Sequence, residues 1–147
     1  MDGLKLLKED HDRFKKLLAE GEETTERARV GRSKLFEDLK RQVEIHERME
    51  EEVLYPALKA HPKAKEIVLE GYEEHHVADL ILAEIAETDP ADERWAAKFK
   101  VLKESLEHHI EEEEGDMFPK ARGIFDSDEL EELGAAMEQI RTESLVK

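Results

Sequence analysis

The sequence repeats itself after 63 or 64 residues, and the repeat carries histidine and glutamate at matching places. The matching pairs are His11 with His75 at 64 residues, and His46 with His109 and Glu50 with Glu113 at 63 residues. The flanks repeat too: Glu9-Asp10-His11 matches Glu73-Glu74-His75, and Leu54-Tyr55-Pro56 matches Met117-Phe118-Pro119. A duplicated helix pair with one such set in each half can place two metal ions side by side in a bundle core.

Four long helices are predicted by apolar residues that recur every three or four positions. We expect them over about 2–27, from residue 32 or 33 to about 57, over 62–87, and after Asp89, which precedes Pro90 and is the predicted N-cap. Asp126 and Glu129 have capping-box spacing and predict a fifth helix over 126–145. We interpret this last helix as a cover over the bundle.

Composition narrows the class of protein. A chain of 147 residues fits a single domain, 1–147, with a four-helix core over 2–124. The net charge of −16 argues against nucleic acid or an anionic membrane as partner. No apolar run is long enough for a membrane span, and Met1–Lys5 lacks the apolar segment of a signal peptide. The absence of cysteine excludes disulfides and thiolate ligands. We expect an all-α protein in the cytoplasm.

Histidine and glutamate occupy positions of the apolar seams where leucine or isoleucine would be expected. His46 and Glu50 lie one turn apart on one helix, as do His109 and Glu113 on another. An unpaired carboxylate in a bundle core costs several kcal/mol, and a cation bound by neighbouring imidazoles would offset that cost. In this spacing the histidine can bind one metal while the glutamate bridges to a second.

The types of the predicted ligands indicate which metals the site would bind and which class of helical metal protein it belongs to. Imidazole with carboxylate suits iron and, less selectively, manganese or zinc. Ferritin-like proteins use Glu-x-x-His on two helices, and only Glu73-x-x-His76 fits that pattern here. We therefore reject a ferritin-like site.

The pattern His…His-x-x-x-Glu, given twice with Leu-Tyr-Pro and Met-Phe-Pro following, resembles the hemerythrin-like (HHE cation-binding) family over residues 4–119. The resemblance implies an up-down-up-down four-helix bundle, here with an additional C-terminal helix, that holds a non-haem di-iron centre. By position, the resemblance implies that one iron is bound by His11 and His46, the other by His75 and His109, with Glu50, Glu113 and an oxo or hydroxo group as bridges.

The chain departs from the oxygen-carrying hemerythrins at two places. Asp79 stands where they have a further histidine, and His109-x-x-x-Glu113 replaces their His-x-x-x-x-Asp. Each iron would then have five ligands and one open position, unless Asp79, a tyrosine or water fills it. This weighs against simple reversible oxygen carriage.

Several neighbouring residues have alternative roles. The repeat selects His75 over His76. His76 and His108 are interpreted as exposed residues or as residues that support a ligand, and His61 as exposed. Glu112, four residues after His108, is interpreted as lying outside the site. Asp79 is a ligand, an acceptor for an imidazole N–H or a boundary residue, and Glu47 is a chelating or a solvated residue. Tyr55 and Phe118 are interpreted as core rings, and Tyr72 could line the pocket.

The leading functional hypothesis is a protein that binds or senses O₂, or reacts with peroxide or nitric oxide, at two irons. The alternative is an iron-sequestering module without turnover. In a third reading the core histidines are incidental to a structural bundle. The sequence identifies no protein partner.

Overall fold

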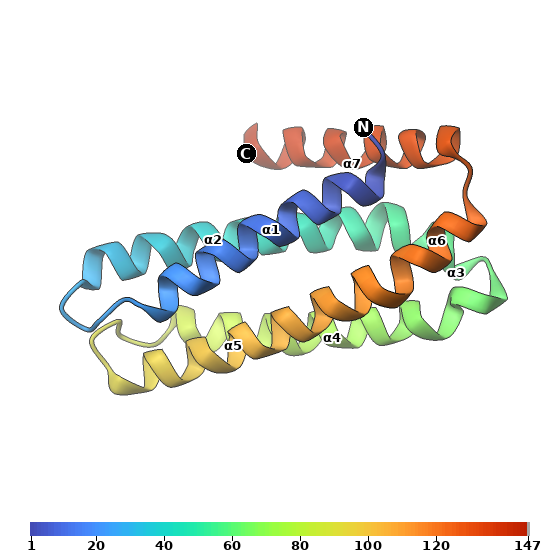
Figure 1. Cartoon of the computed structure of the whole chain (residues 1–147). Helices are drawn as coiled ribbons and strands as arrows, with labels where there is room; N and C mark the ends of the chain where they lie inside the picture. The colour runs from blue at the N-terminus through green and yellow to red at the C-terminus, as the bar shows by residue number, and fades with distance from the viewer. Residues whose placement is uncertain (147) are drawn as a thin grey trace.

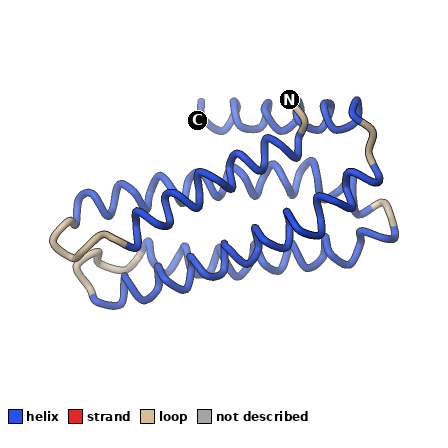
Figure 2. Tube along the Cα trace, viewed as in Figure 1, coloured by secondary structure: helices blue, strands red, loops and turns tan. Residues whose placement is uncertain are grey.

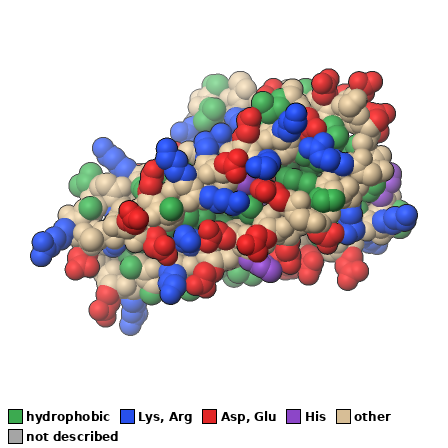
Figure 3. Space-filling model, in the orientation of Figure 1, with side chains coloured by type: hydrophobic (Ala, Val, Ile, Leu, Met, Phe, Trp, Pro, Cys, Tyr) green, Lys and Arg blue, Asp and Glu red, His purple; other side chains and the backbone are tan. Residues whose placement is uncertain are grey.

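The computed structural model describes residues 1–146, and it confirms the all-α four-helix bundle (Figure 1). Consecutive long helices run in opposite directions, and short loops connect them (Figure 2). Two elements form one side of the bundle, α1 (Gly3–Glu22) and α2 (Arg29–Met49), and two form the other, α4 (Pro62–Ala86) and α5 (Glu93–Glu112). Acidic and basic side chains are interspersed on the outer face in Figure 3.

The apolar seams form two separate core clusters. One lies towards α3 (Tyr55–Lys59) and α7 (Ser127–Val146) and includes Leu7, Leu54 and Met117. The other includes Phe14 and Trp95. The predicted ligands lie on the helical turns between these two clusters. Apolar side chains therefore enclose them on both sides. No helix within residues 1–146 is long and apolar enough to cross a membrane.

Two helices contain a π-helical turn that the sequence reasoning did not predict. The first, η1 (Glu50–Leu54), leads into α3 (Tyr55–Lys59), and the second, η2 (Glu113–Met117), leads into α6 (Phe118–Ile124). Each begins at a predicted bridging glutamate, and a proline, Pro56 or Pro119, is the second residue after its end. Proline lacks an N–H and clashes with the carbonyl four residues earlier, so a widened turn relieves that clash.

The widened turn changes which side chains share a face. In an α-helix, residues five apart differ by about 140° around the axis. In η1 the N–H of Tyr55 donates to the carbonyl of Glu50, five residues back, which is a π-type bond. Both side chains can therefore enter the same part of the core, and both are fully buried.

The fifth helix, α7 (Ser127–Val146), packs on α1 and α2 at the outer face of the bundle (Figure 1). The predicted capping box is present: the N–H of Glu129 donates to Asp126 Oδ1 at 2.8 Å, and the N–H of Asp126 donates to Glu129 Oε1 at 3.0 Å.

Three helix ends differ from prediction. α2 begins at Arg29 rather than at residue 32 or 33. α1 ends at Glu22 rather than near residue 27, because the chain turns at Glu23 and Thr24. α5 is capped by Asp92 instead of Asp89, since Asp92 accepts from the N–H of Arg94 while Asp89 accepts from the N–H of Ala91 in the loop.

Candidate metal centre

The structure brings all six predicted ligand residues together in the middle of the bundle. Their ligand atoms form two overlapping groups of four, both of which include Glu50 and Glu113. His11 and His46 complete the first group, and His75 and His109 complete the second. All six side chains are buried, with Glu50 fully inaccessible to solvent. The arrangement is therefore that of two adjacent sites that share two carboxylates.

The Nε2 atoms of the four imidazoles face these shared carboxylates. His75 Nε2 lies 2.9 Å from Glu50 Oε1, and His46 Nε2 lies 3.5 Å from the same oxygen. Across the centre, His11 Nε2 is 3.1 Å from Glu113 Oε1, and His109 Nε2 is 3.3 Å from Glu113 Oε2. Each glutamate thus contacts histidines of both pairs, as a bridging carboxylate must.

Each imidazole is oriented by a further carboxylate on its Nδ1 side. His46 donates from Nδ1 to Asp10 at 2.8 Å, and the repeat-related His109 donates to Glu74 at 2.5 Å. The other two donate over 2.7 Å each, His11 to Glu114 and His75 to Glu51. A carboxylate on Nδ1 fixes the ring and directs Nε2 towards a metal.

These four carboxylates were missed as site residues by the sequence reasoning. Their signal was the acid beside each ligand that recurs in the repeat, such as Asp10 before His11 and Glu74 before His75. Each acid, however, contacts a histidine on a different helix. The pairing therefore depends on the bundle geometry.

The carboxylates that orient the imidazoles have different neighbours in the two halves of the bundle. Asp10 is also held by Arg13 and by Arg141 of α7, whose Nη2 lies 2.6 Å from both Asp10 oxygens. The hydrogen bond with His46 and the positive charges around Asp10 outweigh burial and lower its pKa. The predicted cover helix therefore also supports a site residue.

Tyr55 enters the centre, contrary to its interpretation as a core ring alone. Its hydroxyl donates to Glu113 Oε2 at 2.8 Å and lies 3.3 Å from His75 Nε2. Burial, and then the charges of Glu113 and Glu50, raise the pKa of Tyr55 well above its usual value. In the other half Phe118 stacks on His11 at 5.8 Å between ring centroids and brings no oxygen.

Room for the tyrosine comes from a glycine on α4. A Cβ at Gly71 would lie 2.7 Å from the Tyr55 hydroxyl oxygen, closer than a side-chain carbon can approach. The repeat places Leu7 at the corresponding position, opposite Phe118 rather than a tyrosine. Gly71 and Tyr55 therefore form a matched pair that only one half contains.

The charge balance of the centre fits a cation. Nε2 of His11, His46 and His109, Glu50 Oε2 and Glu113 Oε1 are buried and have no hydrogen-bond partner among the described residues. Burial lowers the pKa of His46, but the charge of Glu50 and the bond to Asp10 outweigh it and raise that pKa to about 10. These five atoms gather in the middle of the bundle without forming hydrogen bonds, so the residues present fit a pair of metal ions.

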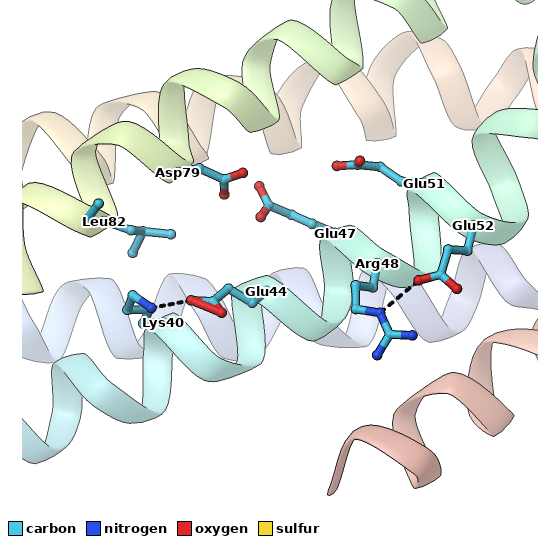
Figure 4. A pocket seen from close by; sticks show the side chains of 9 residues that line it. Lys40, Glu44, Glu47, Arg48, Glu51, Glu52, Asp79 and Leu82 are labelled. Atoms are coloured by element: carbon cyan, nitrogen blue, oxygen red, sulfur yellow. Dashed lines mark hydrogen bonds and ion pairs between the residues drawn. The ribbon is translucent and has the colours of Figure 1, made fainter. Parts of the chain in front are cut away.

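The residues considered as alternatives are mostly outside this centre. His76, His108 and His61 are exposed, and His108 forms an ion pair with Glu112 at 3.2 Å. Asp79 is exposed and faces Glu47 (Figure 4). Glu47, by contrast, is buried with only 7% of its surface exposed, so its interpretation as a solvated residue was wrong.

The fold and the site define a class of protein: a helical bundle with a duplicated histidine–carboxylate centre. The Hemerythrin HHE cation binding domain family matches residues 2–121, and the chain belongs to this family.

Mycobacterial proteins are similar to this chain in sequence and in structure. An uncharacterized protein, Rv2633c, of Mycobacterium tuberculosis (strain ATCC 25618 / H37Rv) is 35% identical over 112 residues, which is 73% of this chain and 68% of the relative. A protein of Mycobacterium bovis shows the same identity and coverage. The crystal structure of a hemerythrin HHE cation binding domain-containing protein from Mycobacterium kansasii matches with a TM-score of 0.83 and 32% identity. That match covers 100% of this chain and 91% of the other.

Proposed function

We propose that this protein holds two iron ions and binds or senses O₂, or reacts with peroxide or nitric oxide, at them. The observation that carries the proposal is the pair of buried ligand groups that share Glu50 and Glu113. Imidazole nitrogen with carboxylate oxygen suits iron, and manganese or zinc would be accepted less selectively. In this proposal His11 and His46 hold one ion, His75 and His109 the other, and the two glutamates bridge them.

The space beside the centre supports a small reactant. A cavity of about 10 Å³ is lined by ligand histidines together with apolar side chains such as Phe14, Val43 and Leu106. A volume of that order holds about one water molecule. Diatomic molecules and peroxide are close to that size, whereas larger organic substrates would require the helices to move apart.

Tyr55 makes the two proposed sites unequal. Its phenol oxygen lies beside His75 and Glu113, where it can supply a further ligand or hold the carboxylate by a hydrogen bond. The corresponding Phe118 stacks on His11 and supplies no donor. We therefore propose that an external ligand binds on the His11 and His46 side, which keeps an open position.

The chain's own residues supply geometry and exclude water. When bound, two adjacent irons would supply redox and Lewis-acid chemistry. Asp10 and Glu114 fix the imidazoles of His46 and His11, while the apolar clusters above and below keep the centre dry.

Iron sequestration without turnover is the second candidate function. It is favoured by the strongly acidic chain, with a net charge of −16, which attracts cations. Both functions share the ligand set and differ in whether an external molecule reaches the metals.

The test begins with protein reconstituted with Fe²⁺ and exposed to air. We expect two irons per chain and a near-ultraviolet band of an oxo bridge. Azide, peroxide and nitric oxide are then added in turn. A spectral change or consumption of peroxide supports the reactive function, while two irons with no response to any of them supports sequestration. One iron or fewer per chain after full reconstitution would refute both.

A further inference from the structure

One face of the bundle departs from the internal repeat at two adjacent positions. On the face between α2 and α4 these positions hold Glu47 and Asp79. On the related face between α5 and α1 they hold Ile110 and Lys15. Ile110 is 2% exposed and belongs to an apolar core cluster. A core position that one half fills with isoleucine is therefore filled with a carboxyl group in the other.

Glu47 has the wrong chemistry for a core residue with only a structural role. Its side chain is buried, and its Oε2 has no hydrogen-bond partner within residues 1–146. A buried polar group without a partner lowers the free energy of unfolding. Isoleucine at this position would avoid that loss of stability. This destabilising glutamate occurs only on the face between α2 and α4.

Glu47 lies between the outside of the molecule and the proposed metal centre. On its outer side a cavity of about 450 Å³ opens between α2 and α4. On its inner side Glu47 lines the small cavity that also contains His11, His46, His75 and His109. It thus forms the wall between the two spaces.

The outer cavity presents two carboxyl groups, those of Glu47 and Asp79, that form no ion pair with a lysine or arginine within residues 1–146. Figure 4 shows the carboxyl groups of Glu47 and Asp79 directed at each other across the cavity, with Glu51 beside them. The other two acids of the wall are paired, since Glu44 contacts Lys40 and Glu52 contacts Arg48. Glu51 also accepts from Nδ1 of His75, so this wall connects to the centre at a second point.

We propose that this cavity is the loading site for the metal centre, where Glu47 and Asp79 bind a hydrated divalent cation such as Fe²⁺ before it passes inward. The proposal rests on the dinuclear metal function proposed above. When both are ionised, the two facing carboxyl groups repel each other, and a shared cation would stabilise them, whereas an anionic ligand would be repelled. On the related face the positive charge of Lys15 would repel a cation, and Ile110 offers it no ligand atom.

The test measures how fast metal-free protein takes up Fe²⁺ under anaerobic conditions. Samples are quenched with a ferrous chelator at successive times, and the iron that stays with the protein is counted. Glu47→Ile and Asp79→Asn should each slow the initial uptake on the order of tenfold, as loss of local charge steering and of a binding group would. The final iron content should still reach that of the wild type, because the six proposed ligands are unchanged.

Two further measurements separate loading from structure and from general charge. Glu47→Ile should unfold at a higher temperature than the wild type while it loads more slowly, a combination that a structural role alone does not give. Glu107→Gln is the matched control, because Glu107 corresponds to Glu44 on the related face and its loss also removes one negative charge. It should load at the wild-type rate.

Each result has a defined meaning. Uptake at the wild-type rate in Glu47→Ile and Asp79→Asn would overturn the loading site but leave the dinuclear centre intact. Equal slowing in Glu107→Gln would overturn it in favour of general electrostatic attraction. A lower final iron content in Glu47→Ile would mean that Glu47 belongs to the centre itself. If the wild type does not bind two irons at equilibrium, the proposed function fails instead.

Discussion

Replacing Tyr55 by phenylalanine would give both halves of the bundle the same ring, and it tests whether the hydroxyl holds Glu113. The hydroxyl donates to Glu113 Oε2 at 2.8 Å in a fully buried place. Hydrogen bonds to charged groups contribute roughly 1.5–3 kcal/mol to stability. Tyr55→Phe should therefore lower the free energy of unfolding by about that amount. For a chain of this size the melting temperature should fall by roughly 3–12 °C.

The assay is urea unfolding of metal-free protein at pH 7, followed by circular dichroism. Tyr72→Phe is the control, because the ring of Tyr72 stands edge-on against Tyr55 while its side chain is only partly buried. It should change stability by less than about 0.5 kcal/mol, as substitutions away from buried networks do. A Tyr55→Phe variant as stable as the control would refute the role given to the hydroxyl.

A glycine substitution tests the same contact from the other side. Gly71→Ala places a Cβ 2.7 Å from the hydroxyl oxygen, so the ring or α4 must shift. Overpacking of this kind costs about 1–3 kcal/mol. The double variant Gly71→Ala with Tyr55→Phe should lose less than the sum of the two single losses, because the oxygen at 2.7 Å is gone and only the ring carbons at 2.9 and 3.1 Å remain in close contact. Strict additivity would mean that these residues do not compete for the same space.

Three further predictions follow from the site. Iron should raise the free energy of unfolding by about 2.7 kcal/mol when free metal is a hundredfold over its dissociation constant. Glu50→Ala should abolish most of the accompanying rise in melting temperature, whereas Glu112→Ala should retain it. Equal loss in both variants would refute the ligand assignment. Arg141→Ala should weaken metal binding by up to about tenfold in competition with a chelator, because it releases the acid that orients His46; unchanged affinity would limit α7 to packing. Glu47 has its pKa raised to about 10, so wild-type stability should fall as pH rises above about 4.5, by up to about 1.4 kcal/mol per pH unit. Glu47→Gln cannot titrate, and its advantage in urea unfolding of metal-free protein should therefore grow from pH 5 to pH 8; a constant difference would contradict the raised pKa.

The clustering of the six candidate ligands could be predicted because two independent patterns select the same residues. The apolar seam places His46, Glu50, His109 and Glu113 inside, and the repeat extends the set to His11 and His75. Where the seam alone was ambiguous, between His75 and His76, the repeat selected the residue that the structure buries. Periodicity predicts burial well because it reflects a single helix.

The features that could not be predicted depend on contacts between helices or on backbone strain. Asp10 orients His46 from another helix, and nothing in the local sequence distinguishes it from a solvated acid. The π turns at Glu50 and Glu113 result from the competition between helix packing and a proline several residues later. Without that widened turn Tyr55 would be assigned to a different face, which is why it was interpreted as a core ring only.

The departures from the repeat are more informative than the repeat itself. An unmodified duplication would give two equivalent sites, and packing alone gives no reason to change only one half. Yet Tyr55 with Gly71 and the buried Glu47 occur once each, and all lie within two helical turns of a proposed ligand. Tyr55 stands beside His75 where the other half has an apolar ring, and Glu47 stands beside His46 where the other half has isoleucine, so each introduces a polar atom at a position that is apolar in the other half. Polar residues that occur in the core of one half and not of the other are expected where the two halves have different tasks. We therefore infer that the two metal positions differ in function, with one side capped by the tyrosine and the other left open to small molecules.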